Sequence, residues 1–396
     1  MSESLPQPSP EALEHSERLR SAITDEARAQ QGIPFSRFME LAMYAPGLGY
    51  YSAGASKFGD EGDFVTAPEL GPVFAACAAE AVAPVLQQLG TDAKFLEVGG
   101  GTGAFAKVAL MRLLELDALP DRYFILEPSA QLKARQRALL FEALPSYLFD
   151  LVEWLDGPVP YDWRGVLFAN EVIDALPVSR FEIGDEREVL EGYVVADSDV
   201  AATMQHEFRG ADEFLARAVN HVQSTLHEPM PQGFRSELLP QLPYWIQAIS
   251  GGMKQGAMLF VDYGYSRAEY YQHDRDQGTV RAFYRHRTHN DLLKWPGLQD
   301  LTASVDFTAL AEAGVEAGFD MAGYCSQASF LLGNGLQGAL ERIERIDDPA
   351  LQMRRRNEVK RLTLPSEMGE RFQVMGFEKD VSFGAAFLVG DLSYRL

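Results

Sequence analysis

The segment KFLEVGGGTGAF, residues 94–105, brings one carboxylate and four glycines close together. Glu97 precedes Gly99, Gly101 and Gly103, and an apolar stretch typical of a helix follows them. Because glycine has no Cβ, a ligand can lie directly against the backbone of such a turn. A carboxylate near the end of a buried strand is costly without a partner, and a cationic group would supply one. These residues therefore predict a ligand-binding turn.

Two kinds of ligand suit this turn. The spacing of Gly99, Gly101 and Ala104 matches G-x-G-x-x-G/A, the pattern of dinucleotide-binding turns. The spacing of Glu97 and the glycines also matches E-x-G-x-G-x-G, the pattern of S-adenosylmethionine-dependent methyltransferases. In that case Glu97 faces the ammonium group of the ligand, while backbone N–H groups at the helix N-terminus face its carboxylate. A tight turn that only caps a helix is the structural alternative.

Two later segments extend the expected cofactor site. Glu127 follows the strand at 122–126, where with either ligand it would accept hydrogen bonds from the two ribose hydroxyls. A solvated loop acid is the alternative for this residue. Trp154 and Leu155 end the third strand, and the indole at this edge either packs on adenine or belongs to the core.

An amide and two carboxylates follow the fourth strand, at Asn170, Glu171 and Asp174. A nicotinamide-dependent oxidoreductase has no evident use for both acids, because a negative pocket would hinder an anionic substrate. A methyltransferase that acts on a cation does use them. If the segment is helical, Glu171 and Asp174 are three residues apart and face the same substrate. A helix-capping arrangement is the structural alternative.

Short apolar strands alternate with helical stretches from Lys94 onward, which indicates an α/β fold with a parallel sheet between helices. Ligands bind at the carboxyl edge of such a sheet, so the residues above would share one site. Three insertions, at about 178–256, 263–305 and 329–380, are predicted to contain a hairpin, irregular chain and helices, respectively. We expect strands at 94–98, 122–126, 148–154, 165–169, 257–262, 319–325 and 383–389.

The first 68 residues lack the alternation of short strands and helices that is seen from Lys94 onward. Helical patterns at about 11–30 and from residue 34 precede a glycine-rich loop at 45–68, and 69–88 indicates another helix. A loop of that length in a compact domain is usually functional or mobile. We therefore divide the chain into an N-terminal segment, residues 1–68, and an α/β domain, residues 69–396, whose insertions cap the active site.

The composition limits the partners. With 57 acidic against 35 basic residues the net charge is −22, which argues against nucleic acid and favours a cationic partner. Cys77 and Cys325 are expected to be buried thiols, because two cysteines form neither a disulfide framework nor a metal quartet. The basic cluster MRRRNEVKR, residues 353–361, is typical of a solvated helix face.

The chain shows no targeting or membrane pattern. Its first residues, MSESLPQPSPEALEHSE, lack a charged-then-apolar signal pattern and are too acidic for an Arg-rich transit peptide. No run of about 18 apolar residues is free of charge and proline, so no membrane span is expected. Together these features predict a cytoplasmic location. The sequence does not decide whether the chain pairs with a second copy, so a homodimer stays open.

Several segments together resemble the MidA-type methyltransferases, a family that includes the mitochondrial arginine methyltransferase acting in respiratory complex I assembly. They occur in the family's order within about residues 38–312: PGLGYY, GDFVTAPEL, the glycine turn, NEVIDALPVSRF, FVDYGY, GTVRAFYRH and DLTASVDFTAL. The resemblance implies a seven-stranded, Rossmann-like class I methyltransferase fold. It implies S-adenosyl-L-methionine as cofactor, an arginine in a protein as acceptor, and a cofactor-side loop that carries Thr66, Pro68 and Glu69.

The chain departs from the family at two places. The glycine turn reads GGGTG where many members have Pro and Arg, which we expect to alter only the rigidity of the turn. Ser304 stands where the family pattern would have His, which speaks against a catalytic role at this position.

A guanidinium has no free lone pair, because its pKa exceeds about 12. We assign its orientation and deprotonation to Glu171 and Asp174, with Asn170 as an orienting amide. His286 and His289 have H-x-x-H spacing, but without further ligands we expect no metal there. A non-catalytic assembly factor and a nicotinamide-dependent oxidoreductase remain the alternatives to a methyltransferase. The candidates for the substrate side are Asp262, Tyr263, His286 and Asp306.

Overall fold

The computed structural model describes residues 5–52, 66–196 and 203–396. The chain forms two compact units, each assembled from separate stretches of sequence. Unit 1 consists of Met1–Phe64, Ile173–Gln241 and Tyr265–Asp306. Unit 2 consists of Val65–Val172, Leu242–Gly264 and Phe307–Leu396.

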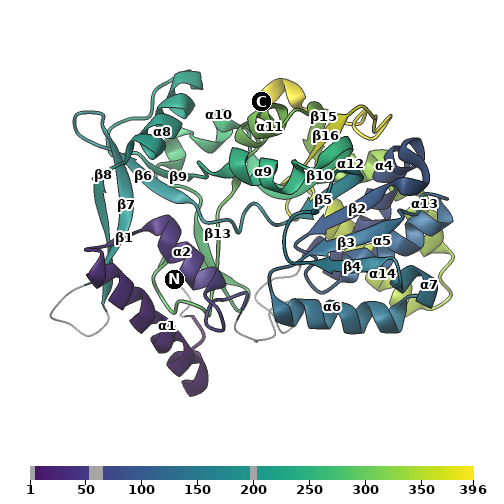
Figure 1. The fold of residues 1–396 in the computed structure, drawn as a ribbon, viewed down its shortest axis with the longest axis horizontal. Coiled ribbons are helices and arrows are strands. Elements are labelled where there is room, and N and C mark those ends of the chain that lie inside the picture. The colour runs from purple at the N-terminus through teal and green to yellow at the C-terminus, as the bar shows by residue number, and fades with distance from the viewer. Residues whose placement is uncertain (1–4, 53–65, 197–202) are drawn as a thin grey trace. The chain divides into compact units, whose positions relative to one another are not determined.

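A mixed sheet forms the centre of unit 2, with strands in the order β15-β16-β10-β5-β2-β3-β4 (Figure 1). The strands from β10 to β4 are parallel to one another, whereas β16 is antiparallel to both of its neighbours. The α/β fold with a predominantly parallel sheet is therefore confirmed. The strands are β2 (Lys94–Val98), β3 (Arg122–Leu126), β4 (Val152–Leu155), β5 (Trp163–Asn170), β10 (Met253–Tyr265), β15 (Asp320–Ser326) and β16 (Phe372–Lys379).

The parallel strands have continuous apolar sequences because helices cover both faces of the sheet. In β5, Val166, Leu167 and Phe168 are all buried, as expected for a parallel strand covered on both faces. One core joins Phe95, Phe168 and the other inward side chains on one face to the packed helices. The helices of unit 2 are α3 (Ala67–Leu70), α4 (Pro72–Leu89), α5 (Ala104–Glu115), α6 (Ala130–Ala143), α7 (Ser146–Phe149), α9 (Leu242–Ser250), α11 (Phe307–Glu316), α12 (Gln327–Gly333), α13 (Leu336–Glu344) and α14 (Pro349–Thr363).

The strand predicted at 383–389 is wrong. The seventh strand is β16, and the apolar run after it is an irregular segment that packs onto the sheet. Phe387 lies so close to Gly376 that a Cβ there would approach its ring to 2.4 Å. Asn334 donates a side-chain hydrogen bond of 2.9 Å to the carbonyl of Ala386. The predicted strand at 148–154 is also shifted, because α7 occupies its first two residues.

Helix α4 is a long, apolar helix of unit 2. The stretch Pro72–Asp92 is long and apolar enough to cross a membrane, but 72% of its most apolar window is buried inside the protein, as is typical of a core helix. Its N-terminus is held by Glu358, whose carboxylate accepts a 2.7 Å hydrogen bond from the backbone of Val73 and contacts Arg355. The basic cluster is therefore more than a solvated helix face. Both cysteines are buried, as predicted.

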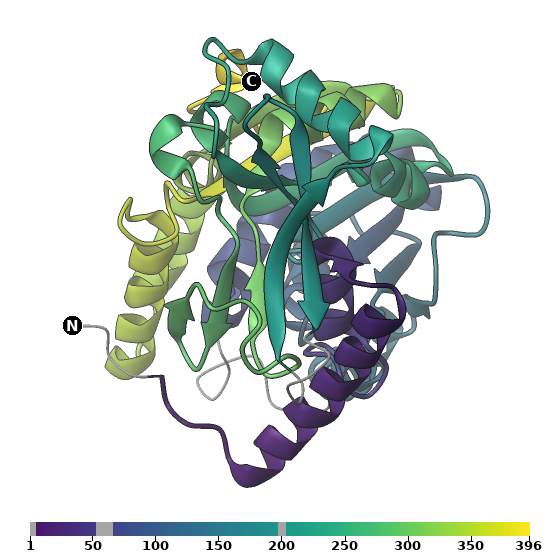
Figure 2. The same ribbon diagram turned by 90° about the vertical axis from the view of Figure 1, so that its left-hand side faces the viewer.

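Unit 1 is built on an antiparallel sheet, with strands in the order β1-β7-β6-β9 and β8 paired with β7 (Figures 1 and 2). The predicted hairpin is β6 and β7. The stretch predicted to be irregular instead contains a small sheet, β12-β11-β13, so that prediction was wrong. The elements are α1 (Pro10–Ala29), β1 (Ile33–Pro34), α2 (Phe35–Tyr44), β6 (Ser179–Ile183), β7 (Val189–Ala196), β8 (Met204–Gly210), α8 (Glu213–Thr225), β9 (Arg235–Leu238), α10 (Arg267–Tyr270), β11 (Arg281–Tyr284), β12 (Arg287–His289), β13 (Asp300–Thr302) and β14 (Val305–Asp306).

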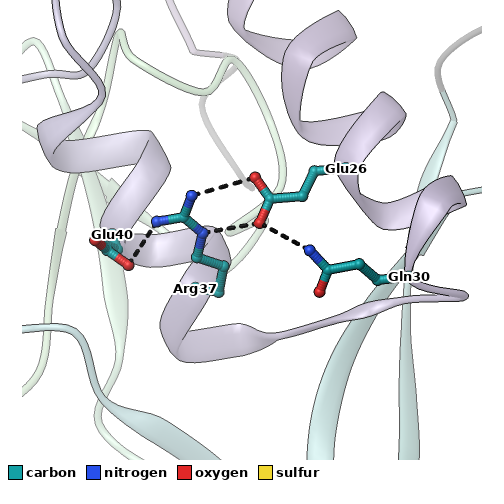
Figure 3. Close-up of polar contacts among 4 residues, drawn as sticks. All are labelled: Glu26, Gln30, Arg37 and Glu40. Carbon is teal, nitrogen blue, oxygen red and sulfur yellow. Dashed lines mark hydrogen bonds and ion pairs between the residues drawn. The ribbon is translucent and has the colours of Figure 1, made fainter.

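An ion-pair network joins α1 to α2 (Figure 3). The guanidinium of Arg37 donates to both carboxylate oxygens of Glu26, at 2.8 and 3.2 Å, and to Glu40 at 2.8 Å. Gln30 adds a longer hydrogen bond of 3.4 Å to Glu26. The two carboxylates raise the pKa of Arg37 further above its ordinary value. Two-pronged contacts of this kind set the orientation of the guanidinium plane between the helices.

Candidate cofactor site

The glycine turn follows β2 and ends where α5 begins. Gly99, Gly101 and Gly103 have φ angles of 71°, 51° and 90°, which favour glycine over any residue with a Cβ. A Cβ added at Gly99 would lie 2.8 Å from Cγ2 of Val172, whereas one at Gly101 would meet nothing within 4 Å. Gly99 is therefore required by packing, and the surface at Gly101 is open.

Glu97 is 2% exposed and lies on β2, beside the hydroxyl of Tyr123. This hydroxyl donates a 2.7 Å hydrogen bond to the carboxylate. Burial raises the pKa of Glu97 to about 7, and the nearby negative charge of Glu127 adds to the increase. The sequence pattern does not single out Tyr123, although Tyr123 pairs across the sheet with Phe95, which lies two positions before Glu97 on the same face of β2.

Glu127 follows β3 and is 4% exposed. Its carboxylate accepts a 3.0 Å hydrogen bond from the backbone N–H of Ser129 and one of 3.3 Å from the Gln136 amide. Burial nevertheless raises the pKa of Glu127 to about 7. The solvated-acid alternative for Glu127 is therefore wrong, because this carboxylate lies inside the protein.

Gln136 on α6 connects three parts of this region. Besides Glu127, its amide nitrogen donates to the carbonyl of Gly101 at 2.9 Å, and its oxygen accepts a 2.8 Å hydrogen bond from the indole of Trp154. The guanidinium of Arg137 lies 4.6 Å from the centre of the Trp154 ring. No motif in the sequence singles out Gln136, although its four-residue spacing from buried Leu140 places both on the same helix face.

The segment before α4 contacts the glycine turn. Thr66 precedes α3, which includes Pro68 and Glu69. The hydroxyl of Thr102, inside the turn, donates a hydrogen bond to the carboxylate of Glu69. The structure thus brings Glu69 to the turn, and its cofactor-side position stays a prediction. The preceding loop residues 53–65 lie outside the described residues.

Asn170 ends β5 at the carboxyl edge of the parallel strands, and Glu171 follows it. The Asn170 amide donates a 3.1 Å hydrogen bond to the Glu171 carboxylate. Glu171 has a φ of 53°, a left-handed conformation that is unfavourable for a residue with a Cβ. Its backbone N–H donates to the carbonyl of Val261 on the adjacent strand β10, at 2.9 Å.

Two of the expected substrate-side residues follow on β10. Asp262 is buried, and its carboxylate accepts a 2.9 Å hydrogen bond from the backbone N–H of Tyr263. The ring of Tyr263 packs edge to face against Phe372, with centroids 5.6 Å apart. Both residues belong to unit 2, as do the glycine turn and Glu171.

Three other predicted site residues belong to unit 1. Asp174 is buried, and with Asp300 it contributes, after burial itself, to a pKa of Tyr51 well above its ordinary value. Asp306 forms a buried ion pair with Arg267, at 3.2 Å. His286 is exposed in the turn between β11 and β12, with a φ of 60°. These contacts do not place the three residues relative to the glycine turn.

Comparison with known protein families identifies the family to which this chain belongs. A family model for S-adenosyl-L-methionine-dependent methyltransferases matches residues 77–325, from α4 to β15. The chain belongs to this family. Its cofactor is S-adenosyl-L-methionine, and the methyltransferase has the class I arrangement, in which an antiparallel strand lies between two others near one edge of the sheet.

A solved structure supports the fold over the whole length. The methyltransferase is 40% identical to a Burkholderia thailandensis protein solved with S-adenosyl-homocysteine, with a TM-score of 0.90 over 99% of this chain and 100% of that one. A native structure from the same organism gives 38% identity and a TM-score of 0.87, over 99% and 100% of the two chains.

Curated relatives carry more specific names. The methyltransferase is 27% identical to the Drosophila melanogaster "Protein arginine methyltransferase NDUFAF7 homolog, mitochondrial", over 93% of this chain and 88% of the relative. It is 24% identical to the corresponding Homo sapiens protein, over 86% and 78%. Both names place the relatives in mitochondria, which contradicts the predicted cytoplasmic location. That prediction depended only on residue types and took no account of where related proteins act.

Proposed function

We propose that this methyltransferase transfers a methyl group to the guanidinium of an arginine in a protein acceptor. The names of the curated relatives support this acceptor, and the net charge of −22 suits a basic one. The resemblance described above suggests a subunit of respiratory complex I as the acceptor. The proposal thus adds a protein arginine, as the acceptor, to methyl transfer from S-adenosyl-L-methionine.

The residues at the carboxyl edge of the sheet fit the cofactor. In the proposed arrangement Glu97 faces its amino group, the glycine turn faces its carboxylate, and Glu127 accepts hydrogen bonds from its ribose. Two buried carboxyls with raised pKa values, next to an open glycine at 101, support this arrangement. Bound there, the cofactor supplies an electrophilic methyl group. The proposed edges of the site are Thr66, Pro68, Glu69, Trp154, Leu155 and Asn170.

The observation that carries the catalytic proposal is the backbone of Glu171. A left-handed conformation at a residue other than glycine costs about 1 to 3 kcal/mol and is found preferentially at functional sites. Glu171 keeps this conformation directly after β5, with Asn170 bonded to its carboxylate. We assign to Glu171 the proton that the guanidinium nitrogen would lose on taking the methyl group, whose bond to the cofactor sulfur would break to leave S-adenosyl-homocysteine. Asn170 orients the Glu171 carboxylate, and Asp174 is the second candidate acid.

The substitution Glu171→Gln tests this assignment. It keeps the volume but removes the charge, so we expect turnover to fall about 10²- to 10⁴-fold, as for loss of a positioned proton acceptor. Cofactor affinity, measured by calorimetry, should stay within a few-fold. The exposed Glu142 on α6 provides the matched control Glu142→Gln, which should keep wild-type turnover. Wild-type turnover in Glu171→Gln, with cofactor bound, would remove Glu171 from the mechanism.

The acceptor is identified with labelled S-adenosyl-L-methionine. The wild-type enzyme and Glu171→Gln are each incubated with mitochondrial extract, and the labelled protein is hydrolysed to amino acids. We expect a labelled band with the wild-type enzyme alone, and the label in methylarginine. Label in methyllysine would overturn the acceptor class. Cofactor binding without any labelled product would favour the non-catalytic assembly factor.

A further inference from the structure

We infer that Gln136 is a positioning residue for the cofactor site, holding the glycine turn and the Glu127 carboxylate in the orientation that binds S-adenosyl-L-methionine. The inference rests on the proposed placement of the cofactor against Gly101 and Glu127. Gln136 lies on α6, outside the segments that suggested the site from the sequence. Its side chain is the contact that all three neighbouring segments share.

The hydrogen-bonding groups around Gln136 determine how its amide is oriented. The indole N–H of Trp154 is only a donor, so the amide oxygen must face it. The amide nitrogen then faces the carbonyl of Gly101 and the carboxylate of Glu127, which are both acceptors. The one donor among the three partners thus faces the amide oxygen, and the two acceptors face the amide nitrogen. A carboxylate at position 136 could not replace it, because it would have no proton to donate.

The glycine turn also packs against Gln136. A Cβ at Gly100 would lie 3.2 Å from the amide nitrogen of Gln136 and 2.9 Å from Cγ2 of Ile125. A Cβ at Gly103 would lie 3.4 Å from Cα of Gln136. The glycine at 100, which neither ligand pattern requires, is explained by this close approach. The turn therefore takes its position from α6 as well as from β2.

The position of Gln136 suits a role in binding more than a role in filling space. The side chain is fully buried, where an apolar residue of similar volume would fill the same space. An apolar residue would leave the Trp154 N–H and the Gly101 carbonyl without their partner. The amide also stabilises the ionised form of Glu127, which is the form with the most acceptor sites for ribose hydroxyls.

The test compares Gln136→Glu and Gln136→Met with the wild-type protein, measuring S-adenosyl-L-methionine affinity by calorimetry at pH 6 and pH 8. At pH 8 we expect both variants to bind about 10-fold more weakly or worse, because hydrogen bonds to a charged group and to the turn are lost. At pH 6 the deficit of Gln136→Glu relative to wild type should shrink, because a protonated carboxyl can donate one hydrogen bond. The deficit of Gln136→Met should not shrink at pH 6, because methionine has no hydrogen-bond donor at either pH.

Three controls separate the possible outcomes. Gln337→Glu makes the same change on the exposed face of α13 and should bind like wild type at both pH values. Thermal unfolding without cofactor shows that each variant is folded, and Gln136→Met alone decides the question if Gln136→Glu does not fold. Wild-type affinity in a folded Gln136 variant at pH 8 overturns the inference, as does a Gln136→Glu deficit independent of pH. Unchanged affinity in Glu127→Ala would instead overturn the cofactor placement on which the inference rests.

Discussion

At the scale of single residues, the two buried carboxyls Glu97 and Glu127 should make stability depend on pH. Both have a pKa of about 7 in the folded protein, against an ordinary value of 4.5, because of burial. Between these values each of the two carboxyls binds more protons in the folded than in the unfolded state, so their contribution to stability falls as the pH rises from about 4.5 to about 7. Each carboxyl contributes up to roughly 3 kcal/mol to the decrease.

Denaturant unfolding of the cofactor-free protein at pH 5, 6, 7 and 8 measures this decrease, with Glu97→Gln as the comparison. The variant has lost one of the two titrating groups, so its free energy of unfolding should depend less steeply on pH. Parallel pH profiles for the two proteins would show that Glu97 does not titrate in this range.

The strained backbone of Glu171 gives a second prediction at this scale. Replacing Ala by Gly usually destabilises a protein, but at a φ of 53° the order should reverse. We expect Glu171→Gly to be more stable than Glu171→Ala by about 1 kcal/mol, while both lose methyl transfer. Urea denaturation and a transfer assay measure the two effects. If Glu171→Gly is the less stable variant, the backbone at this position is not strained.

At the scale of elements, the glycines of the turn should differ in their tolerance of a side chain. Gly99→Ala adds a clash with Val172 to an unfavourable φ, whereas Gly101→Ala has the unfavourable φ alone. We expect Gly99→Ala to lower the free energy of unfolding by about 1 to 3 kcal/mol more than Gly101→Ala does. The double variant Gly99→Ala, Val172→Ala should recover part of that difference in urea denaturation. Equal stabilities for the two single variants would contradict this account of the turn.

The elements also show why some predictions succeeded. The strands at 94–98 and 122–126 match the structure residue for residue, because short buried strands bounded by turns have a distinct pattern. The run at 383–389 has the same apolar character, but Phe387 fits against glycines on the sheet and the run does not form a strand. The carboxyl-edge residues follow from strand ends, whereas Gln136 and Tyr123 depend on contacts between elements that no local pattern contains.

At the scale of the whole molecule, the net charge of −22 should influence how the acceptor is recognised. Opposite charges steer association and are screened by salt, with a Debye length of about 10 Å at 0.1 M. For a basic arginine-containing peptide, kcat/KM should therefore fall as NaCl is raised from about 50 to about 500 mM. Calorimetric affinity for S-adenosyl-L-methionine should change much less. A salt-independent kcat/KM would mean that the acidic surface takes no part in acceptor capture.

The position of β16 has a consequence for biosynthesis. This strand lies between β10 and β15 and pairs with both, yet it follows both of them in the sequence, at Phe372–Lys379. Domains usually fold as units while the ribosome makes the chain, with N-terminal domains first. Here the sheet cannot close until residue 379 has emerged from the ribosome, and until then the strand edges of β10 and β15 lack their shared partner. The two strand edges therefore need protection from aggregation until Lys379 has been made.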